Sequence, residues 1–502
     1  MGMYFALSPL LLLALSGCGL MISEAYGRFR EDGHAGEEGP SNSLALTSAI
    51  CLLMTALLAL GIGLRGPETI EGFDKVAPHL LVDRFSMFFT VVVCLGGALA
   101  SLLAGGYLPE HNLDRGEFYS LLMFSTLGCV VLAMAGDLLT QFLGLETMSL
   151  GVYALTGFRR GSARSNEASL KYFLLGSFAA ALMLYGGALL YGVTGHTDLA
   201  GIGQALAPGK DVPWAIVLFG FVLMLVGLLF KVSAVPFHMW APDAYEGAPT
   251  PAMTFMAVAV KSAAFAMMLR VLVLSFGGAN FTSWGSGWPP VLAAIAVLTM
   301  TVANLTAGRQ ESVKRMLAYS SVAHAGYVLV GVVATTRLPG EGQGSVLLYL
   351  LGYTVSTAGA LGALILMGRR GEEAVSYQDL DGIARRHPGA ALAMSFFLLS
   401  LAGIPPSAGF FAKLYVFKAA IGAGYYWLAV LGLLNSVLGA YYYLKVMVHM
   451  YMREPNQGAP IATPMRSGLV TAALVLSALL VLMLGIMPGS SLSVALQSVA
   501  RG

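Results

Sequence analysis

Residues 213–240 read PWAIVLFGFVLMLVGLLFKVSAVPFHMW. The first 18 residues of this stretch carry no charge, and an apolar run of this length predicts a helix that crosses a bilayer. The run then meets one lysine, Lys231, and five residues later Pro236. Proline lacks a backbone N–H and clashes with the preceding turn, so the helix should be interrupted there. Interrupted backbone at membrane depth is tolerated only inside protein or beside a wet cavity.

The whole chain has the composition of a membrane protein. Of its 502 residues, 57% are hydrophobic and only 11% are charged, against about 25% charged in soluble domains. We therefore predict an all-α, polytopic membrane protein with about fourteen transmembrane helices. The candidate spans lie near 4–22, 43–63, 83–107, 117–136, 137–158, 168–194, 213–240, 249–276, 287–307, 316–336, 344–368, 389–420, 425–452 and 466–487. The polar stretches around 23–42 and 369–388 are expected to be loops.

Composition also excludes several classes of function. The formal net charge of +2 gives no case for a nucleic-acid partner. The four cysteines stand apart without CxxC or CxxH spacing, so neither a metal site nor a cluster is expected on this chain. Leu15 to Cys18 has the form of a lipoprotein cleavage site, but residues 1–22 contain no Lys or Arg. We therefore expect a retained first helix, with cleavage as the alternative.

Lysine and arginine in the loops predict the orientation. One side would hold Arg28, Arg30, Arg115, Arg159, Arg160, Arg164, Arg309, Lys314, Arg315, Arg369, Arg370, Arg385, Arg386, Arg453 and Arg466. The other would hold Arg65, Lys75, Arg84, Lys210, Arg337 and Arg501. The richer side should be cytoplasmic, which places both termini on the periplasmic side of a bacterial inner membrane.

Five ionisable residues lie deep within the candidate spans. They are Glu146, Lys231, Lys261, His324 and Lys413. A charge at the bilayer centre costs about 2.5–3.5 kcal/mol even on the mildest scale. Static ion pairs, snorkelling lysines or a hydrogen-bonded core histidine are the structural alternatives. Burial disfavours a charged amine and a nearby carboxylate favours it, so a row of such groups, bridged by water or hydroxyls, could relay protons.

Helix-breaking prolines recur at matching places. Pro236 interrupts the seventh span, and Pro405-Pro406 interrupts the twelfth. Glu146 and His324 are on the fifth and tenth spans, again five apart. A second five-helix unit would cross the membrane upside down, which predicts two inverted repeats with broken helices 7 and 12. The expected parts are 1–107 (helices 1–3), 117–276 (spans 4–8), 287–452 (spans 9–13) and 466–502 (last helix and tail).

Three motifs resemble one family. They are FKVSAVPFHMWAPDAYEGAPTP at 230–251, KRMLAYSSVAHAGY at 314–327 and LAGIPPSAGF at 401–410. Together they look like the antiporter-like subunits of respiratory complex I, over nearly the whole chain. DAYEGAP at 243–249 and NSVLGAYYY at 435–443 resemble the N-type subunit. The M-type usually has a glutamate at the position of Lys413, and the L-type carries extra C-terminal spans and a lateral helix.

The resemblance implies a function and roles. Glu146 and Lys231 would be a coupled pair, Lys261 the central relay, Lys413 the terminal site, and His324 the connection between the halves. The chain would carry protons while NADH, FMN, iron–sulfur clusters and quinone bind partner subunits, so it would hold no cofactor itself. Its partners would be the neighbouring membrane subunits of complex I and the lipid bilayer. Two alternatives stay open: a subunit of a cation/proton antiporter or membrane-bound hydrogenase, and a scaffold whose charges are static.

Overall fold

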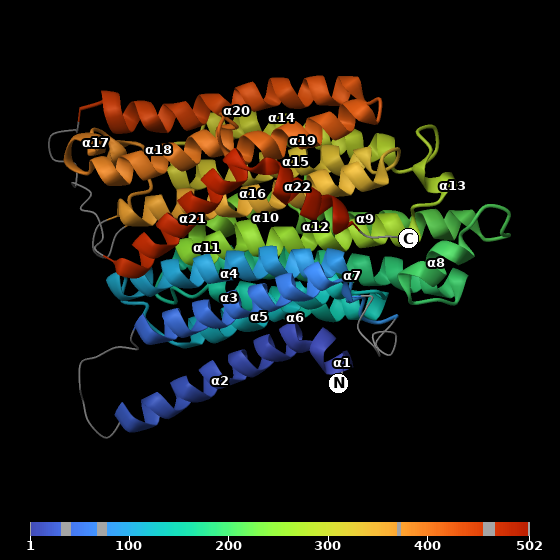
Figure 1. Ribbon diagram of the computed structural model, residues 1–502, viewed down its shortest axis with the longest axis horizontal. Helices are drawn as coiled ribbons and strands as arrows, with labels where there is room; N and C mark the ends of the chain where they lie inside the picture. Colours follow the sequence, from blue (N-terminus) through green and yellow to red (C-terminus); the bar gives the residue numbers. More distant parts are fainter. Residues whose placement is uncertain (1, 32–41, 68–77, 369–372, 455–466, 500–502) are drawn as a thin grey trace.

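The computed structural model describes the chain except residues 1, 32–41, 68–77, 369–372, 455–466 and 500–502. Long helices run side by side along the horizontal axis of Figure 1. They are α2 (Ser8–Glu31), α3 (Asn42–Arg65), α4 (Arg84–Glu110), α5 (Glu117–Met134), α6 (Leu138–Thr156), α7 (Ala163–Thr194), α9 (Trp214–Lys231), α14 (Pro289–Gly308), α15 (Val313–Ala334), α16 (Pro339–Leu366), α20 (Tyr426–Met452) and α21 (Gly468–Ile486). The β-structure of the described part of the chain consists of isolated β-bridges.

The two predicted breaks are present. Helix α9 ends at Lys231, residues 232–239 are not helical, and α10 (Trp240–Gly247) follows. The twelfth span is likewise divided into α18 (Pro388–Ala402) and α19 (Ala408–Gly422). Thirteen described segments are long and apolar enough to cross a membrane. With the divided α18–α19 span they make the fourteen crossings that the sequence predicts.

The eighth span contains two π-helical turns that the sequence did not predict. It consists of α11 (Thr250–Phe255), a π-helical turn η3 (Met256–Val260), α12 (Lys261–Arg270) and a second π-helical turn η4 (Val271–Ser275). Turns of this kind are rare and gather at functional sites. Lys261 is the first residue after the first of them.

The prediction that the polar stretches are loops was partly wrong. Helix α2 continues to Glu31, so much of 23–42 is helical, and residues 32–41 lie outside the described part. The second stretch contains a short 3₁₀ turn, η5 (Gln378–Leu380), and α17 (Ile383–Arg386). Polar residues permit a helix wherever its end reaches beyond the bilayer into water. Four further short helices are α1 (Gly2–Ala6), α8 (Leu199–Ala205), α13 (Ala279–Thr282) and α22 (Pro488–Gln497).

The bundle has two ends, which we call the α17 end and the α8 end (Figure 1). Helices α1 and α22 both lie toward the α8 end, as an even number of crossings requires. Two helix pairs pack closely through glycine. A Cβ at Gly144 would meet the backbone of Leu132, and one at Gly326 would meet that of Met300. These glycines are on the fifth and tenth spans, so the same close contact occurs at two places five spans apart.

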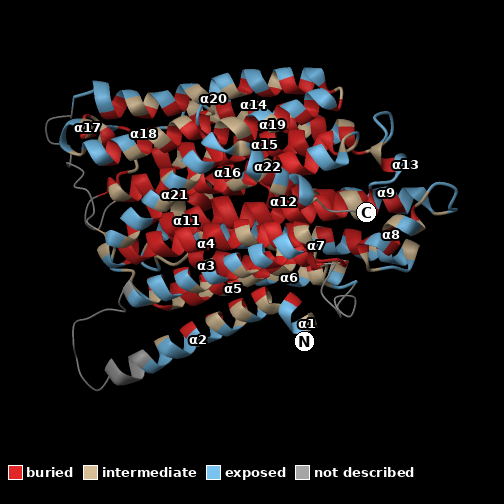
Figure 2. Cartoon of the chain, viewed as in Figure 1, coloured by how far each residue is buried: buried red, intermediate tan, exposed pale blue. Residues whose placement is uncertain are grey.

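Burial separates inner from outer helices (Figure 2). The eighth span, α15 and α16 are almost wholly covered by other helices, whereas α2, α7 and α20 expose one side. The exposed sides of these helices carry large apolar residues such as Leu15, Phe178 and Val437. An apolar outer surface of this kind suits lipid, because lipid chains cannot hydrogen-bond to polar groups. The inner helices carry Lys261 and His324, so these residues lie at the centre of the protein.

Candidate functional site

The three deep lysines are all inside the protein. Their exposed fractions are 3% for Lys231, 2% for Lys261 and 7% for Lys413. None of them forms an ion pair with a carboxylate in the described part of the chain. Each is held by neutral oxygens, which solvate an ammonium group but do not neutralise it. The lysines therefore neither snorkel to an interface nor form static salt bridges.

Lys261 lies at the middle of the row. Its Nζ donates to the Ser321 carbonyl oxygen at 2.6 Å and to the Ser321 hydroxyl. Ser321 is on α15, one turn before His324. The π-helical turn η3 directly precedes Lys261 and changes the helical phase with which it faces α15.

His324 continues the row on α15. Its Nδ1 is 2.7 Å from the Tyr349 hydroxyl, and its Nε2 is 3.1 Å from the Tyr443 hydroxyl. The Tyr443 hydroxyl also contacts the hydroxyl of Ser320. His324 is thus a hydrogen-bonded core histidine. It also lies within electrostatic range of both Lys261 and Lys413, so the two readings of this residue do not exclude each other.

Lys413 occupies the break in the twelfth span. Its Nζ donates to the carbonyl oxygen of Ala402 and to the Ser436 hydroxyl, both at 2.9 Å. Ala402 ends α18, and the last carbonyls of a helix have no partner within it. Gly403 follows with φ of +88°, and a Cβ there would lie 3.0 Å from the Lys413 side chain. The break therefore supplies both a free acceptor and the room for the lysine.

Lys231 occupies the corresponding break in the seventh span. Its Nζ donates to Ser149 Oγ at 2.9 Å and to the Tyr153 hydroxyl at 3.5 Å. Glu146 is one turn before Ser149 on α6, and its Oε1 is buried without a hydrogen-bond partner among the residues that the structure describes. The structure thus brings Glu146 and Lys231 into electrostatic range without a direct salt bridge.

Sequence reasoning expected hydroxyls along the row but did not identify them. Those that contact the row are Ser149, Tyr153, Ser321, Tyr349, Ser436 and Tyr443, and Ser320 contacts the Tyr443 hydroxyl. The runs AYSS and AYYY inside the quoted motifs were the available signal. On α16, the hydroxyls of Tyr353 and Thr354 are buried without a partner in the described part of the chain. Buried polar groups of this kind usually bind water, and the Tyr353 and His324 rings are 5.0 Å apart.

A largely buried carboxylate, Glu373, lies at the α17 end of the site. Glu373 forms an ion pair with Lys314 at 2.8 Å and accepts hydrogen bonds from Thr250 at 2.9 Å and from Tyr107. Arg159 lies 3.8 Å away. Burial alone would raise the pKa of Glu373, but Lys314 and the other donors outweigh it and lower the pKa to about 2. The carboxylate joins α4, α15 and the eighth span.

Further charges at this end are paired. Glu167 and Lys171, four residues apart at the start of α7, form a local ion pair at 2.6 Å. The pair extends to Asp243 on α10, which also contacts Arg315. The salt bridges that link α7, α10 and α15 fix the second half of the broken seventh span to the tenth span. A permanent network of this kind differs from the unpaired lysines inside the bundle.

Arg270 shows what a structural ion pair looks like in this protein. Its two terminal nitrogens each donate to Asp83 at 2.7 Å, and the Phe85 ring packs against it. It is the last residue of α12, near the end of the eighth span.

No group of three or more His, Cys, Asp or Glu suited to a metal ion occurs among the residues that the structure describes.

Comparison with known proteins identifies a family. Residues 135–439, more than half of the chain, match the family described as "NADH:quinone oxidoreductase/Mrp antiporter, TM". The chain belongs to this family. The matched range runs from the start of the fifth span to the thirteenth and includes all five deep ionisable residues.

Two curated relatives of this family are similar over most of their length. "NADH-quinone oxidoreductase subunit N 1" of Sorangium cellulosum is 67% identical over 502 residues, or 99% of each chain. "NADH-quinone oxidoreductase subunit N" of Trichlorobacter lovleyi is 44% identical over 438 residues, 86% of each chain.

Solved structures share the architecture. A chain of respiratory complex I from Thermus thermophilus aligns with a TM-score of 0.78 at 34% identity, covering 97% of this chain and 98% of that one. A chain of the Mrp complex from Dietzia sp. aligns with a TM-score of 0.83 at 22% identity, covering 98% and 96%. At that identity the second likeness speaks for the fold alone.

Proposed function

We propose that this chain works as an N-type, proton-translocating membrane subunit of NADH:quinone oxidoreductase, respiratory complex I. Its path would run through Glu146, Lys231, Lys261, His324 and Lys413. The observation that carries the proposal is the set of three buried lysines whose partners are hydroxyls and carbonyls rather than carboxylates. An amine in this setting has no counter-ion that fixes its charge, so it can release a proton and take one up.

Transfer along the row follows from its contacts. Glu146 would exchange a proton with Lys231 through Ser149 and Tyr153. Lys261 would pass its proton along α15 toward His324 through the Ser321 hydroxyl and bound water, and the His324 ring contacts the Tyr443 hydroxyl directly. Lys413 would receive it at the twelfth-span break. Electrostatic coupling in a low-dielectric interior makes each site respond to the charge on its neighbours.

Redox chemistry would belong to partner subunits. NADH, FMN, iron–sulfur clusters and quinone would bind elsewhere in the complex, and this chain would respond to them through neighbouring membrane subunits. The membrane would be a bacterial inner membrane. Arginine and lysine in the loops favour the α17 end as cytoplasmic, since Arg159, Lys314 and Arg385 lie there. Both termini would then be periplasmic.

The antiporter and hydrogenase alternatives predict the same helices with other partners. Relatives named as subunit N, at up to 67% identity, favour complex I, whereas the Mrp likeness is confined to the fold. Purification of the tagged chain from its own membranes separates these alternatives. Copurification with NADH-oxidising subunits supports the proposal, and copurification with antiporter or hydrogenase subunits overturns it.

Lys231→Ala tests the relay itself. In the intact complex in sealed vesicles, NADH-driven proton pumping and quinone reduction should fall at least tenfold. Lys210→Ala, an exposed lysine in the segment before α9, is the matched control and should keep full pumping. Blue-native gels report assembly in parallel. Loss of assembly with normal turnover per complex would favour a scaffold, and full pumping by Lys231→Ala would remove Lys231 from the path.

A further inference from the structure

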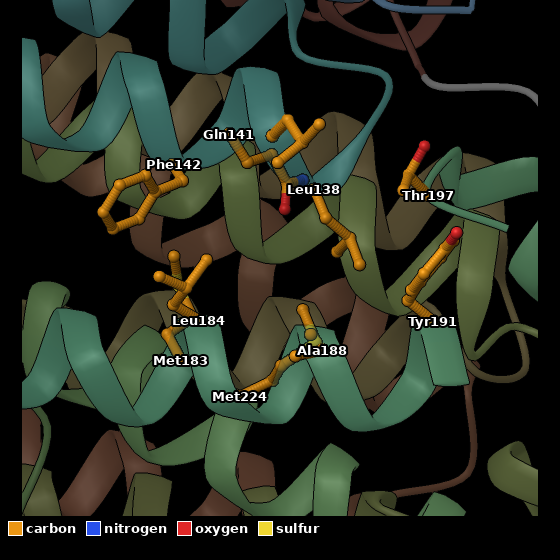
Figure 3. A pocket seen from close by; sticks show the side chains of 11 residues that line it. Leu138, Gln141, Phe142, Met183, Leu184, Ala188, Tyr191, Thr197 and Met224 are labelled. Atoms are coloured by element: carbon orange, nitrogen blue, oxygen red, sulfur yellow. The ribbon is translucent and has the colours of Figure 1, made fainter. Parts of the chain in front are cut away.

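A cavity of about 350 Å³ lies between α6, α7 and α9, outside the lysine row (Figure 3). Its walls are mostly apolar, with Leu138, Phe142, Met183 and Met224 among them. Ligand pockets commonly measure about 300–1,000 Å³, so this cavity has room for one chain-like ligand. The proton path makes no use of it.

One buried polar side chain faces this cavity. Gln141 is 1% exposed and is among the lining residues. Among the residues that the structure describes, neither its amide nitrogen nor its amide oxygen has a hydrogen-bond partner. A buried amide without partners is unfavourable, and a ligand that supplies an acceptor or a donor removes this cost.

The cavity is open toward the bilayer. Leu139, Leu184 and Tyr191 line it and are 57%, 41% and 52% exposed on the outer, apolar surface. A bilayer surrounds this surface, so the molecules that reach the opening first are lipids. Apart from Gln141, Tyr191 and Thr197, the walls offer an apolar chain that enters from the bilayer no polar side chain.

The polar groups of the cavity match the layout of a phospholipid. Tyr191 and Thr197 carry hydroxyls at the α8 end of the cavity, near the end of α7. Gln141 is four residues from Asp137, the N-cap of α6, so it lies about 6 Å inside that edge at 1.5 Å per residue. The ester groups of a lipid lie at the boundary between headgroup and hydrocarbon. Met183 and Phe142 lie deeper, where the acyl chain would run.

We propose that this cavity binds one acyl chain of a membrane phospholipid, with its ester carbonyl accepting a hydrogen bond from the Gln141 amide. The site is on the face of α6 that also carries Ser149, eight residues further on, and Met224 precedes Lys231 by seven residues on α9. The bound lipid would therefore pack directly against α6 and α9, which carry Ser149 and Lys231. It would exclude water from the side of Lys231 that faces the α8 end.

Photo-crosslinking tests this site on the whole complex. The purified complex is reconstituted with a phospholipid that carries a diazirine in its acyl chain, irradiated and digested. Peptides from α6 and α7 should be labelled at the cavity. Ala188→Trp fills the cavity and should reduce this labelling at least tenfold. Gln141→Leu keeps the shape, removes the amide and should reduce it two- to tenfold.

Ala181→Trp is the matched control. Ala181 is exposed on the same helix, seven residues from Ala188, and does not line the cavity, so cavity labelling should be unchanged. If Ala188→Trp does not assemble, Gln141→Leu decides. Equal labelling in all variants overturns the proposal. The proposal is also overturned if the lipid probe labels a partner subunit's segment and not the peptides of α6 and α7. It is overturned as well if an isoprenoid quinone, but no phospholipid, displaces the probe from the cavity.

Discussion

The ammonium group of Lys261 is bound to Ser321 twice, through the backbone carbonyl at 2.6 Å and through the hydroxyl. The carbonyl fixes the position of the lysine, whereas the hydroxyl can both accept and donate a proton. One serine therefore connects the eighth span to the tenth, where His324 lies one turn further along. This contact also explains why Lys261 remains at the centre of the bundle without a counter-ion.

Ser321→Ala should slow pumping without abolishing it. The carbonyl contact to Lys261 survives and one hydrogen bond is lost, so a two- to tenfold decrease is expected. Pumping per NADH in sealed vesicles measures it. Ser262→Ala is the control, because the Ser262 hydroxyl bonds only to Val258 of its own helix. Equal effects of the two changes would remove Ser321 from the path.

Tyr443→Phe should impair the connection beyond His324. The Tyr443 hydroxyl contacts both His324 Nε2 and Ser320, and phenylalanine keeps the ring while removing this link. Pumping should fall several-fold with assembly unchanged on blue-native gels. Tyr119→Phe, a buried tyrosine on α5 away from the row, should pump normally. A normal rate in Tyr443→Phe would contradict the assigned link.

Gly403→Ala should damage the terminal site. Gly403 has φ of +88°, which an L-residue adopts at a cost of about 1–2 kcal/mol, and its Cβ would press on Lys413. Pumping should decrease several-fold. Gly389→Ala on the same divided span has open space around it and should have no effect. If both variants behave like the parent, Lys413 does not depend on the geometry of this break.

Glu373 gives a pH dependence of stability. Its pKa in the folded protein is about 2, against an ordinary value of 4.5. The carboxylate therefore contributes about 3 kcal/mol above pH 4.5, and this contribution is lost as the pH falls from 4.5 toward 2. Glu373→Gln should lower the thermal unfolding midpoint at pH 7 and weaken its acid dependence.

Glu341→Gln is the control for this change, since Glu341 is exposed at the start of α16. The thermal unfolding midpoint of Glu341→Gln should match that of the parent at pH 7 and at a pH below 4.5. A Glu373→Gln variant with the parental midpoint at pH 7 would mean that Lys314 and Tyr107 gain nothing from the carboxylate.

Much of this architecture could be predicted from the sequence because its signals are local. A run of apolar residues fixes each span, and Pro236 and Pro405 remove backbone donors where they stand. The deep positions of Lys231 and Lys413 follow from counting residues along a helix. All three are statements about one segment at a time.

Contacts between segments could not be predicted in this way. The hydroxyls of Ser149 and Tyr443 reach Lys231 and His324 from other helices, and no residue count reveals such pairings. The π-helical turns beside Lys261 depend on packing rather than on composition. Glu146 and Lys231 were expected to form a coupled pair. The absence of a direct bridge between them depends on side-chain geometry on α6.

Proton pumping by the Lys261→Met complex shows whether the ionisable amine of Lys261 carries protons across the membrane. Methionine fills the same space without an ionisable group, and blue-native gels confirm that the compared complexes are assembled. Lys418→Met, an exposed lysine on α19, is the control. We expect at least a tenfold loss of NADH-driven proton uptake in the Lys261→Met complex and no loss in the Lys418→Met complex. Parental proton uptake per NADH in Lys261→Met would contradict it.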